Sequence, residues 1–257
     1  MKSSLFILTL LLAGLPLLQA QDTVAVASDT ASIPETLAIV DTTASADSLQ
    51  VKKECRFVRD WKRPCPGGEV HRFRATTLIA PTLMFATGAS IAFNPYLKRH
   101  VDMEVTDVMY TRPTPRIRVE DYVQYTPAVA PYVLNLCGLK GQHGYRDLLN
   151  LTAASYLFSV SMLWPIKYTV GVERPNSHNK FSFPSGHTVT AFTGAEILRR
   201  EYREYPFVGI CGYAVAATVG ALRIYHGYHW FSDVLAGAAI GILGTSIAYW
   251  LAPYLRF

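Results

Sequence analysis

The most restrictive feature of this sequence is an apolar run near its end, "DVLAGAAIGILGTSIAYW", which extends over 233–250. After Asp233 the run contains no charged residue, and its length and composition are typical of a helix that spans a bilayer. Its "GAAIG" stretch places small residues on one face, which allows another helix to approach closely. A chain with such a run must bury that helix in lipid or among other helices.

From Thr76 onward, apolar segments alternate with short polar breaks, as expected for a series of helices. The chain is 50% hydrophobic and 17% charged, which is more apolar than an ordinary soluble domain. The segments lie at roughly 76–93, 122–139, 147–166, 186–200, 207–225 and 233–252. Two of them are weaker candidates for crossing a membrane, because polar residues interrupt 122–139 and because 186–200 is short and ends in charged residues. The predicted fold class is all-α, a six-helix bundle that is at least partly embedded in a membrane.

The part of the chain before this bundle divides into three predicted regions. Residues 1–20 have the pattern of a secretory signal peptide, and an uncleaved anchor helix is the less favoured alternative. Residues 21–54 are rich in Ser, Thr and Ala and predict a disordered linker, with an edge strand around "TLAIV" as the alternative. Residues 55–75 form a basic juxtamembrane segment that could rest on anionic head groups. The helical domain is assigned to 76–257.

Charge between the segments predicts two conflicting orientations. The stretch 51–74, with eight Lys or Arg against three acids, and "RREYR" at 199–203 would both be cytoplasmic by the positive-inside rule. A cleaved signal peptide instead places 51–74 outside. The 167–184 loop is then cytoplasmic if every segment spans, and periplasmic if one early segment only dips into the bilayer. The exported tail favours a bacterial envelope protein with this loop in the periplasm.

The chain has four cysteines. Cys55 and Cys65 flank "RFVRDWKRP" and could pair in an oxidising compartment, although their spacing alone does not establish a disulfide. A zinc site is not expected there, since no second cysteine pair or histidine cluster lies nearby. Cys137 and Cys211 lie in apolar runs, so we expect both to be core thiols.

A turn in "FSFPSGHTVTAF" (181–192) carries the first candidate site residues. Pro184 stops any preceding helix, and Ser185 and Gly186 are good helix-start residues. The free backbone N–H groups of such a start can bind an anion, and His187 lies in the first turn beside it. Alone, "PSGH" is a weak signal that is equally compatible with a plain helix cap and a surface histidine.

Two flanking stretches supply cations and a second histidine. Upstream, "KYTVGVERP" contains Lys167 and Arg174; downstream, "RIYHGYHWFSD" contains Arg223, His229 and Asp233. Arginine forks match phosphate oxygens, and lysine adds a point charge. His229 and Asp233 are four positions apart and would share a face of a helix. The carboxylate would then fix one imidazole tautomer and leave the other nitrogen nucleophilic.

The order K-x6-RP, PSGH, R-x5-H-x3-D over 167–233 resembles the type 2 phosphatidic acid phosphatase (PAP2) superfamily. That superfamily includes lipid phosphate phosphatases, bacterial non-specific acid phosphatases and vanadium haloperoxidases. Three motifs in the right order are far more specific than any one alone. The sequence departs from the family pattern at Leu222, where the family usually has Ser. An additional His226 inside the third motif is expected to be a satisfied interface histidine.

The resemblance implies a role for each matched residue. His229 would be the nucleophile, Asp233 would orient it, and His187 would protonate the leaving oxygen. Water would then release phosphate from the phosphohistidine, with His187 acting as base. The phosphate oxygens would be held by Lys167, Arg174, Ser185, Gly186 and Arg223. No metal or other cofactor is expected, since no Asp/Glu cluster of metal-ligand type lies near these motifs.

The expected function is that of a membrane-bound phosphatase acting on a lipid phosphate. Lipid A or an isoprenyl diphosphate is favoured over phosphatidate and phosphatidylglycerophosphate, and membrane lipids are the other expected partners. The net charge of +5 without a long basic tract argues against a nucleic-acid partner. Three alternatives stay open: a soluble periplasmic acid phosphatase of the same superfamily, a vanadate-dependent haloperoxidase, and a non-catalytic membrane scaffold or lipid carrier.

Overall fold

The computed structural model describes residues 74–110, 118–177 and 179–255, and within these ranges all regular secondary structure is helical. The helices are α3 (Thr76–Phe93), α4 (Pro95–Leu97), the π-helical segment η2 (Lys98–Met103), α5 (Glu104–Met109), α6 (Glu120–Val123), α7 (Thr126–Leu136), α8 (Tyr145–Val170), α9 (Gly186–Glu201), α10 (Pro206–Tyr225) and α11 (Phe231–Leu255). The all-α prediction is confirmed. The predicted count of six is incomplete, because α4, η2, α5 and α6 lie between α3 and α7.

Several sequence predictions fall on residues before position 74. The signal peptide, the linker at 21–54, nearly all of the basic segment at 55–75, and the possible Cys55–Cys65 pair lie outside the described residues. They stay predictions.

Local sequence explains where the site-bearing helices begin and end. Helix α9 begins at Gly186, with Ser185 as its N-cap directly after Pro184, as predicted. Helix α8 ends where Gly171 takes φ 64°, a left-handed conformation that glycine adopts without steric cost. Helix α10 begins at Pro206, whose ring fixes a helical φ at a position that needs no N–H donor.

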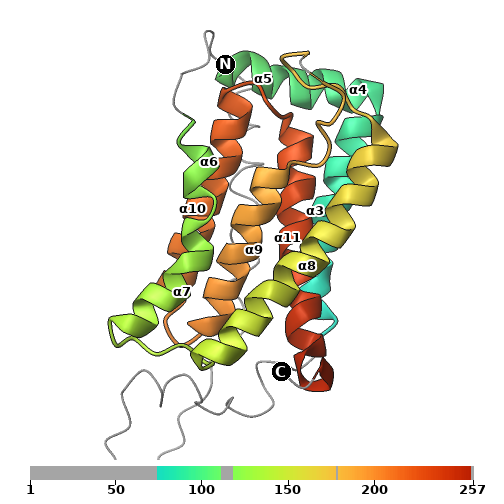
Figure 1. The fold of residues 1–257 in the computed structure, drawn as a ribbon. Helices are drawn as coiled ribbons and strands as arrows, with labels where there is room; N and C mark the ends of the chain where they lie inside the picture. The colour runs from blue at the N-terminus through green and yellow to red at the C-terminus, as the bar shows by residue number, and fades with distance from the viewer. Residues whose placement is uncertain (1–73, 111–117, 178, 256–257) are drawn as a thin grey trace, which may run out of the picture. The chain divides into compact units, whose positions relative to one another are not determined.

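Two helices form the centre of the bundle. Helix α11 packs against α3, α8 and α9, and α9 also packs against α7 and α10. In Figure 1, α9 and α11 begin at the upper end of the bundle, where α8 and α10 end. The segments α4, η2 and α5 cross this same end. The fold therefore brings two helix starts and two helix ends together.

Helices α9 and α11 approach closely through the small-residue face that the sequence predicted. A Cβ added at Gly237 would lie 2.7 Å from the carbonyl oxygen of Ser185, and one at Gly241 would lie 2.8 Å from the backbone nitrogen of Thr193. Cβ atoms do not pack this closely against backbone, so only glycine fits at both positions.

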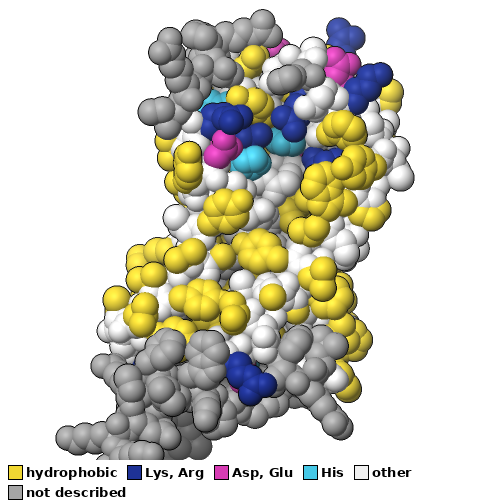
Figure 2. Space-filling model, viewed as in Figure 1, with side chains coloured by type: hydrophobic (Ala, Val, Ile, Leu, Met, Phe, Trp, Pro, Cys, Tyr) yellow, Lys and Arg dark blue, Asp and Glu magenta, His cyan; other side chains and the backbone are white. Residues whose placement is uncertain are grey.

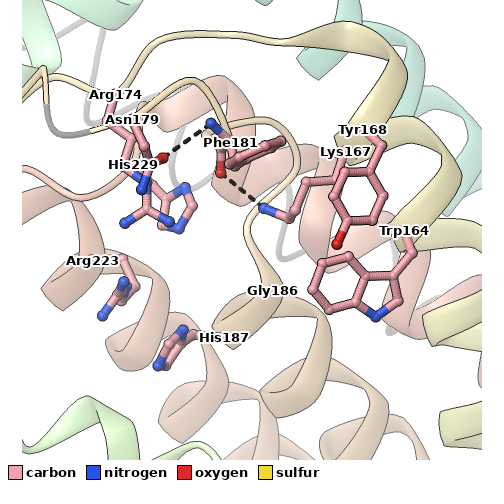
Figure 3. Close-up of a pocket in the computed structure, with 10 residues that line it drawn as sticks. All are labelled: Trp164, Lys167, Tyr168, Arg174, Asn179, Phe181, Gly186, His187, Arg223 and His229. Carbon is pink, nitrogen blue, oxygen red and sulfur yellow. Dashed lines mark hydrogen bonds between the residues drawn. The ribbon is translucent and has the colours of Figure 1, made fainter.

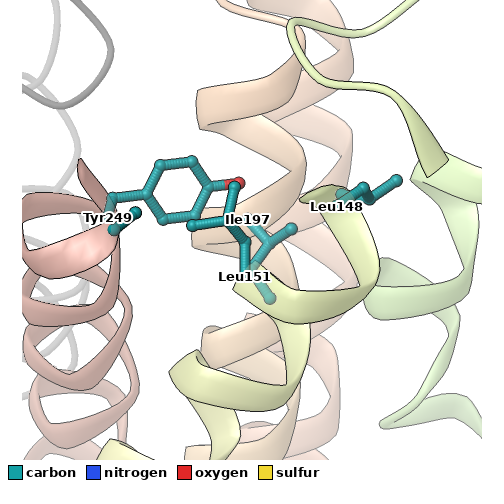
Figure 4. Close-up of a cluster of buried hydrophobic side chains, with 5 residues drawn as sticks. Leu148, Leu151, Ile197 and Tyr249 are labelled. Carbon is teal, nitrogen blue, oxygen red and sulfur yellow. The ribbon is translucent and has the colours of Figure 1, made fainter. Parts of the chain in front are cut away.

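Toward the other end of the bundle, apolar side chains join the central helices. Leu148 and Leu151 of α8, Ile197 of α9 and Tyr249 of α11 form one buried cluster (Figure 4). Each of them is at most 1% exposed. Burial of this kind supplies the main stabilisation of packed helices inside a protein.

The charged end of α9 is neutralised inside the bundle. Glu196 is buried, and its carboxylate accepts hydrogen bonds at 2.7 Å from both Arg199 and Arg200. The hydroxyl of Tyr213 on α10 donates to the same carboxylate at 2.6 Å. This network explains how a helix with too much charge to span a membrane alone can occupy the centre of the fold.

Four of the described helices, α3, α8, α10 and α11, are long and apolar enough to cross a membrane. Helices α7 and α9 are not, in agreement with the weak spans predicted at 122–139 and 186–200. Large apolar side chains such as Leu83, Leu157 and Phe207 are exposed on the spanning helices. Figure 2 shows apolar side chains spread below a group of charged residues near one end. The chain is a membrane protein.

The prediction for two cysteines is wrong. Cys137 and Cys211 are exposed thiols rather than core thiols. Cys137 is the C-cap of α7, and Cys211 lies on an exposed face of α10. An apolar run in a membrane helix does not distinguish the face that meets lipid from the face that meets other helices.

We expect Gly241→Leu to destabilise the fold, because the added side chain overlaps the backbone of α9. Overpacking of this kind costs about 1–3 kcal/mol, which should lower the midpoint of thermal unfolding in detergent by several degrees. Ala217→Leu changes an exposed alanine of α10 and is the matched control. Equal midpoints for the two variants would contradict the close contact between α9 and α11.

Candidate active site

The converging helix ends enclose a pocket with a volume of about 380 Å³ (Figure 3). It is lined by Trp164, Lys167, Tyr168, Arg174, Asn179, Phe181, Gly186, His187, Arg223 and His229. These residues come from α8, α9, α10, the loop between α8 and α9, and the turn before α11. Six residues of the three sequence motifs thus meet in one place, namely Lys167, Arg174, Gly186, His187, Arg223 and His229.

Hydrogen bonds fix the loop between α8 and α9 against the turn before α11. The indole N–H of Trp230 donates to the carbonyl of Glu173 at 2.7 Å. Within the loop, the backbone N–H of Arg174 donates to the carbonyl of Asn179 at 3.1 Å. These bonds set the position of Arg174 relative to His229.

The sequence predicted that His229 and Asp233 share a helix face. In the structure α11 begins at Phe231, so His229 lies in the turn before the helix. Its Nδ1 nevertheless lies 3.4 Å from Oδ2 of Asp233 in the first turn of α11. Both side chains are buried. An Nδ1–H group donated to this carboxylate leaves the lone pair of Nε2 free for chemistry.

The carboxylate of Asp233 is held by two further donors. The hydroxyl of Ser182 and the backbone N–H of Trp230, the latter at 2.8 Å, both donate to Oδ2. The sequence analysis did not assign Ser182 to the site. It is part of the quoted "FSFPSGH" stretch, but no spacing rule connects it to Asp233, which lies 51 positions away.

Three cationic side chains line the pocket, and each has N–H groups without a hydrogen-bond partner among the described residues. Lys167 donates to the carbonyl of Phe181 at 3.0 Å, which leaves two of its three N–H donors. The Nε groups of Arg174 and Arg223 are buried and have no hydrogen-bond partner within the described ranges. Buried donors are normally satisfied, so these two guanidinium groups are prepared to donate to an anion.

His187 pairs with a carboxylate from a distant segment. Its Nε2 lies 2.8 Å from Oδ1 of Asp121 in α6, and Oδ2 of Asp121 binds Nε of Arg118 at 3.0 Å. Burial lowers the pKa of His187 below 6.5, the charge of Arg223 lowers it further, and the contact with Asp121 opposes both.

Glu120, the other carboxylate of α6, contacts two basic side chains behind the pocket. Oε1 of Glu120 lies 2.7 Å from Nδ1 of His226 and 3.4 Å from Nη1 of Arg223, and all three side chains are buried. This contact confirms His226 as a satisfied histidine. The sequence analysis assigned neither Asp121 nor Glu120 to the site. Only the fold brings residues more than 100 positions apart together.

Ser185 and Gly186 have different positions at the start of α9. Gly186 lines the pocket, next to first-turn N–H groups that have no intrahelical partner. Ser185 is buried behind it, where its backbone N–H donates to the carbonyl of Asp233 at 3.0 Å. Its hydroxyl accepts a hydrogen bond from Thr188 at 2.9 Å. Ser185 therefore links the starts of α9 and α11.

We expect inorganic phosphate to raise the unfolding midpoint of the protein in detergent, because a ligand of the folded state stabilises it. Arg174→Gln should remove most of this shift, since it deletes a charge and an unpaired donor of the pocket. Arg146→Gln, at the exposed start of α8, is the matched control and should keep the full shift. An equal shift in both variants would contradict an anion site at Arg174.

Comparisons with known proteins agree with this arrangement. Residues 144–257 match the family model of the PAP2 superfamily. The "Lipid A 1-phosphatase" of Porphyromonas gingivalis is 34% identical over 140 residues, which cover 54% of this chain and 32% of that protein. The "Bacitracin transport permease protein BcrC" of Bacillus licheniformis is 36% identical over 76 residues, 30% of this chain and 36% of that protein. The chain thus spans about a third of the length of these curated relatives.

A solved structure shares the fold. The transmembrane PAP2 type phosphatidylglycerolphosphate phosphatase from Bacillus subtilis superposes with a TM-score of 0.50 and is 21% identical, covering 70% of this chain and 96% of that one. All three motifs of the pocket, including Lys167, fall within the matched residues 144–257. Residues 144–257 of this chain thus match the PAP2 superfamily, and the order of the three pocket motifs agrees with that match.

Proposed function

We propose that this protein is a phosphatase that removes phosphate from a membrane lipid through a phosphohistidine formed on His229. The observation that carries the proposal is the pocket itself, where Lys167 and two guanidinium groups whose Nε atoms have no partner among the described residues surround a histidine backed by a buried carboxylate. Phosphoryl transfer needs mainly positive charge around the phosphate oxygens and a positioned nucleophile. The match of residues 144–257 to the PAP2 superfamily supports the same reaction.

In the first step, the Nε2 lone pair of His229 attacks phosphorus, and the bond between phosphorus and the lipid oxygen breaks. His187 gives its proton to the leaving oxygen, so that the lipid departs as a neutral alcohol. The three cations of the pocket hold the remaining phosphate oxygens. Asp233 stabilises the positive charge that develops on the His229 ring.

In the second step, water attacks the phosphorus of the phosphohistidine and the N–P bond breaks. His187, now neutral, accepts a proton from the attacking water. Inorganic phosphate leaves, and His229 returns to its neutral form with the proton on Nδ1, facing Asp233.

The electrostatic environment keeps His229 in its neutral, nucleophilic form. Burial, together with the charges of Arg223, Lys167 and Arg174, holds the pKa of His229 well below its ordinary value of 6.5. His229 is therefore neutral at pH 7 and nucleophilic without prior loss of a proton.

The position of the pocket supports a lipid substrate. It lies at the end of the bundle where α8 and α10, both candidate membrane spans, terminate. A phosphate at head-group depth would reach this site from the bilayer. The relative from P. gingivalis makes lipid A the favoured substrate, with an isoprenyl diphosphate as the second candidate. We further propose that the pocket faces the periplasm, as the predicted exported tail indicates.

His229→Ala should abolish phosphate release from lipid A by detergent-purified protein, a loss of roughly 10³-fold or more, because it removes the proposed acceptor of the phosphoryl group. His100→Ala removes an exposed histidine outside the pocket and is the control that should retain activity. Wild-type release should continue in EDTA, because the cations of the chain perform the charge stabilisation. Release by the His229 variant at the wild-type rate would rule out the phosphohistidine.

The pH profile of kcat/KM should fall on the alkaline side as His187 loses its proton, and on the acid side as His229 gains one. Asp121→Asn should move the alkaline limb to lower pH, because it removes a carboxylate that favours the protonated imidazole of His187. Asp147→Asn, near the far end of α8, should leave both limbs in place. An alkaline limb unchanged by Asp121→Asn would argue against His187 as the general acid.

A further inference from the structure

One wall of the pocket is aromatic and carries no charge. Trp164 and Tyr168 lie one turn apart on α8 with their rings stacked, 5.3 Å between centroids and 20° between planes. Phe181 meets the ring of Tyr168 edge-on, with 5.6 Å between centroids. The three side chains are 45%, 65% and 43% exposed, although all of them line the pocket. They offer an apolar surface to whatever is attached to a bound phosphate.

The aromatic wall lies at the depth of the phosphate and not of the lipid chains. Lys167 lies between Trp164 and Tyr168 in sequence, and residues of one helical turn are within about 6 Å of each other along the axis. Figure 3 shows both rings beside Lys167, across the pocket from Arg223 and His187. The group that meets these rings is therefore the part of the substrate next to its phosphate.

A carboxylate lies behind the side of the pocket that His187 lines. Asp121, whose side chain is 27% exposed, lies 2.8 Å from the ring of His187, which in the proposed reaction protonates the leaving oxygen, while Glu120 is fully buried. Arg118 offsets one of these two negative charges, and Arg223 is shared with the phosphate site. Within the described part of the chain, the pocket lining has three cations, Lys167, Arg174 and Arg223, enough for a single phosphate group. Among the described lining residues no further cation remains for a second phosphate on the leaving side, which would approach the aromatic rings and Asp121.

We propose that Trp164, Tyr168 and Phe181 form a subsite for an uncharged sugar ring, so that the substrate is a phosphomonoester carried by a glycolipid. The inference rests on the proposed function and narrows its substrate class. The C–H face of a sugar packs on aromatic rings, and its hydroxyl groups can donate to the carboxylate of Asp121. The second phosphate of a diphosphate can make neither contact, and it adds a charge for which the described lining has no further cation.

The kinetic test compares kcat/KM for lipid A, phosphatidate and farnesyl diphosphate in detergent micelles. Trp164→Ala should lower the value for lipid A by roughly tenfold, the effect of losing one aromatic contact, and change the value for phosphatidate far less. Phe207→Ala, which removes a more exposed aromatic side chain at the start of α10, is the control for general lipid anchoring. Asp121→Asn should raise farnesyl diphosphate hydrolysis relative to lipid A.

A binding test separates this inference from the proposed reaction. Glucose 1-phosphate and glycerol 3-phosphate both present a phosphomonoester, so the ratio of their Kd values for the His229→Ala protein reports only the attached group. We expect tighter binding of glucose 1-phosphate, and loss of that preference in the His229→Ala, Trp164→Ala double variant. Equal Kd values, equal losses on lipid A and phosphatidate, or a wild-type preference for the diphosphate would each overturn the sugar subsite. Absence of any hydrolysis together with a glucose 1-phosphate preference would instead reject the proposed function and keep the subsite.

Discussion

The close contact between α9 and α11 is the constraint on which the site depends. Glycines at 237 and 241 let the two helices meet at backbone distance, and the N–H of Ser185 then bonds to the carbonyl of Asp233. Both helices begin at the same end, so His187 and His229 enter one pocket from two helix starts. The positive ends of both helix dipoles point toward an anion bound there.

The cations that line the pocket need negative charge nearby, and three carboxylates behind the pocket provide it. Asp233 lies beneath His229, while Glu120 and Asp121 of α6 lie beside Arg223. These carboxylates reduce the repulsion among like charges without occupying the Nε groups of Arg174 and Arg223. The electrostatic cost of gathering three cations around the pocket is therefore lowered.

The membrane helices also show why hydrophobicity alone does not predict which surface meets lipid. Helix α11 contains the most continuous apolar run, yet 61% of its spanning window is buried by protein, compared with 22% for α3. Small residues make α11 a good core helix, because neighbours can approach it closely. Cys211 on α10 shows the opposite case. It lies in an apolar run, but its side chain is exposed on the protein surface instead of being buried by neighbouring helices.

The sequence by itself determined the helical class and the start of α9 after Pro184, because these follow from local periodicity and helix-start signals. It also marked the six motif residues that line the pocket, through the order of three motifs that resembles the PAP2 superfamily. Only the tertiary structure decided that Ser182 holds Asp233, that α6 supplies the acidic partners of His187 and Arg223, and that Trp164 and Tyr168 face the same pocket. Those contacts join residues far apart in the chain. They depend on how the helices pack, and no local pattern records that.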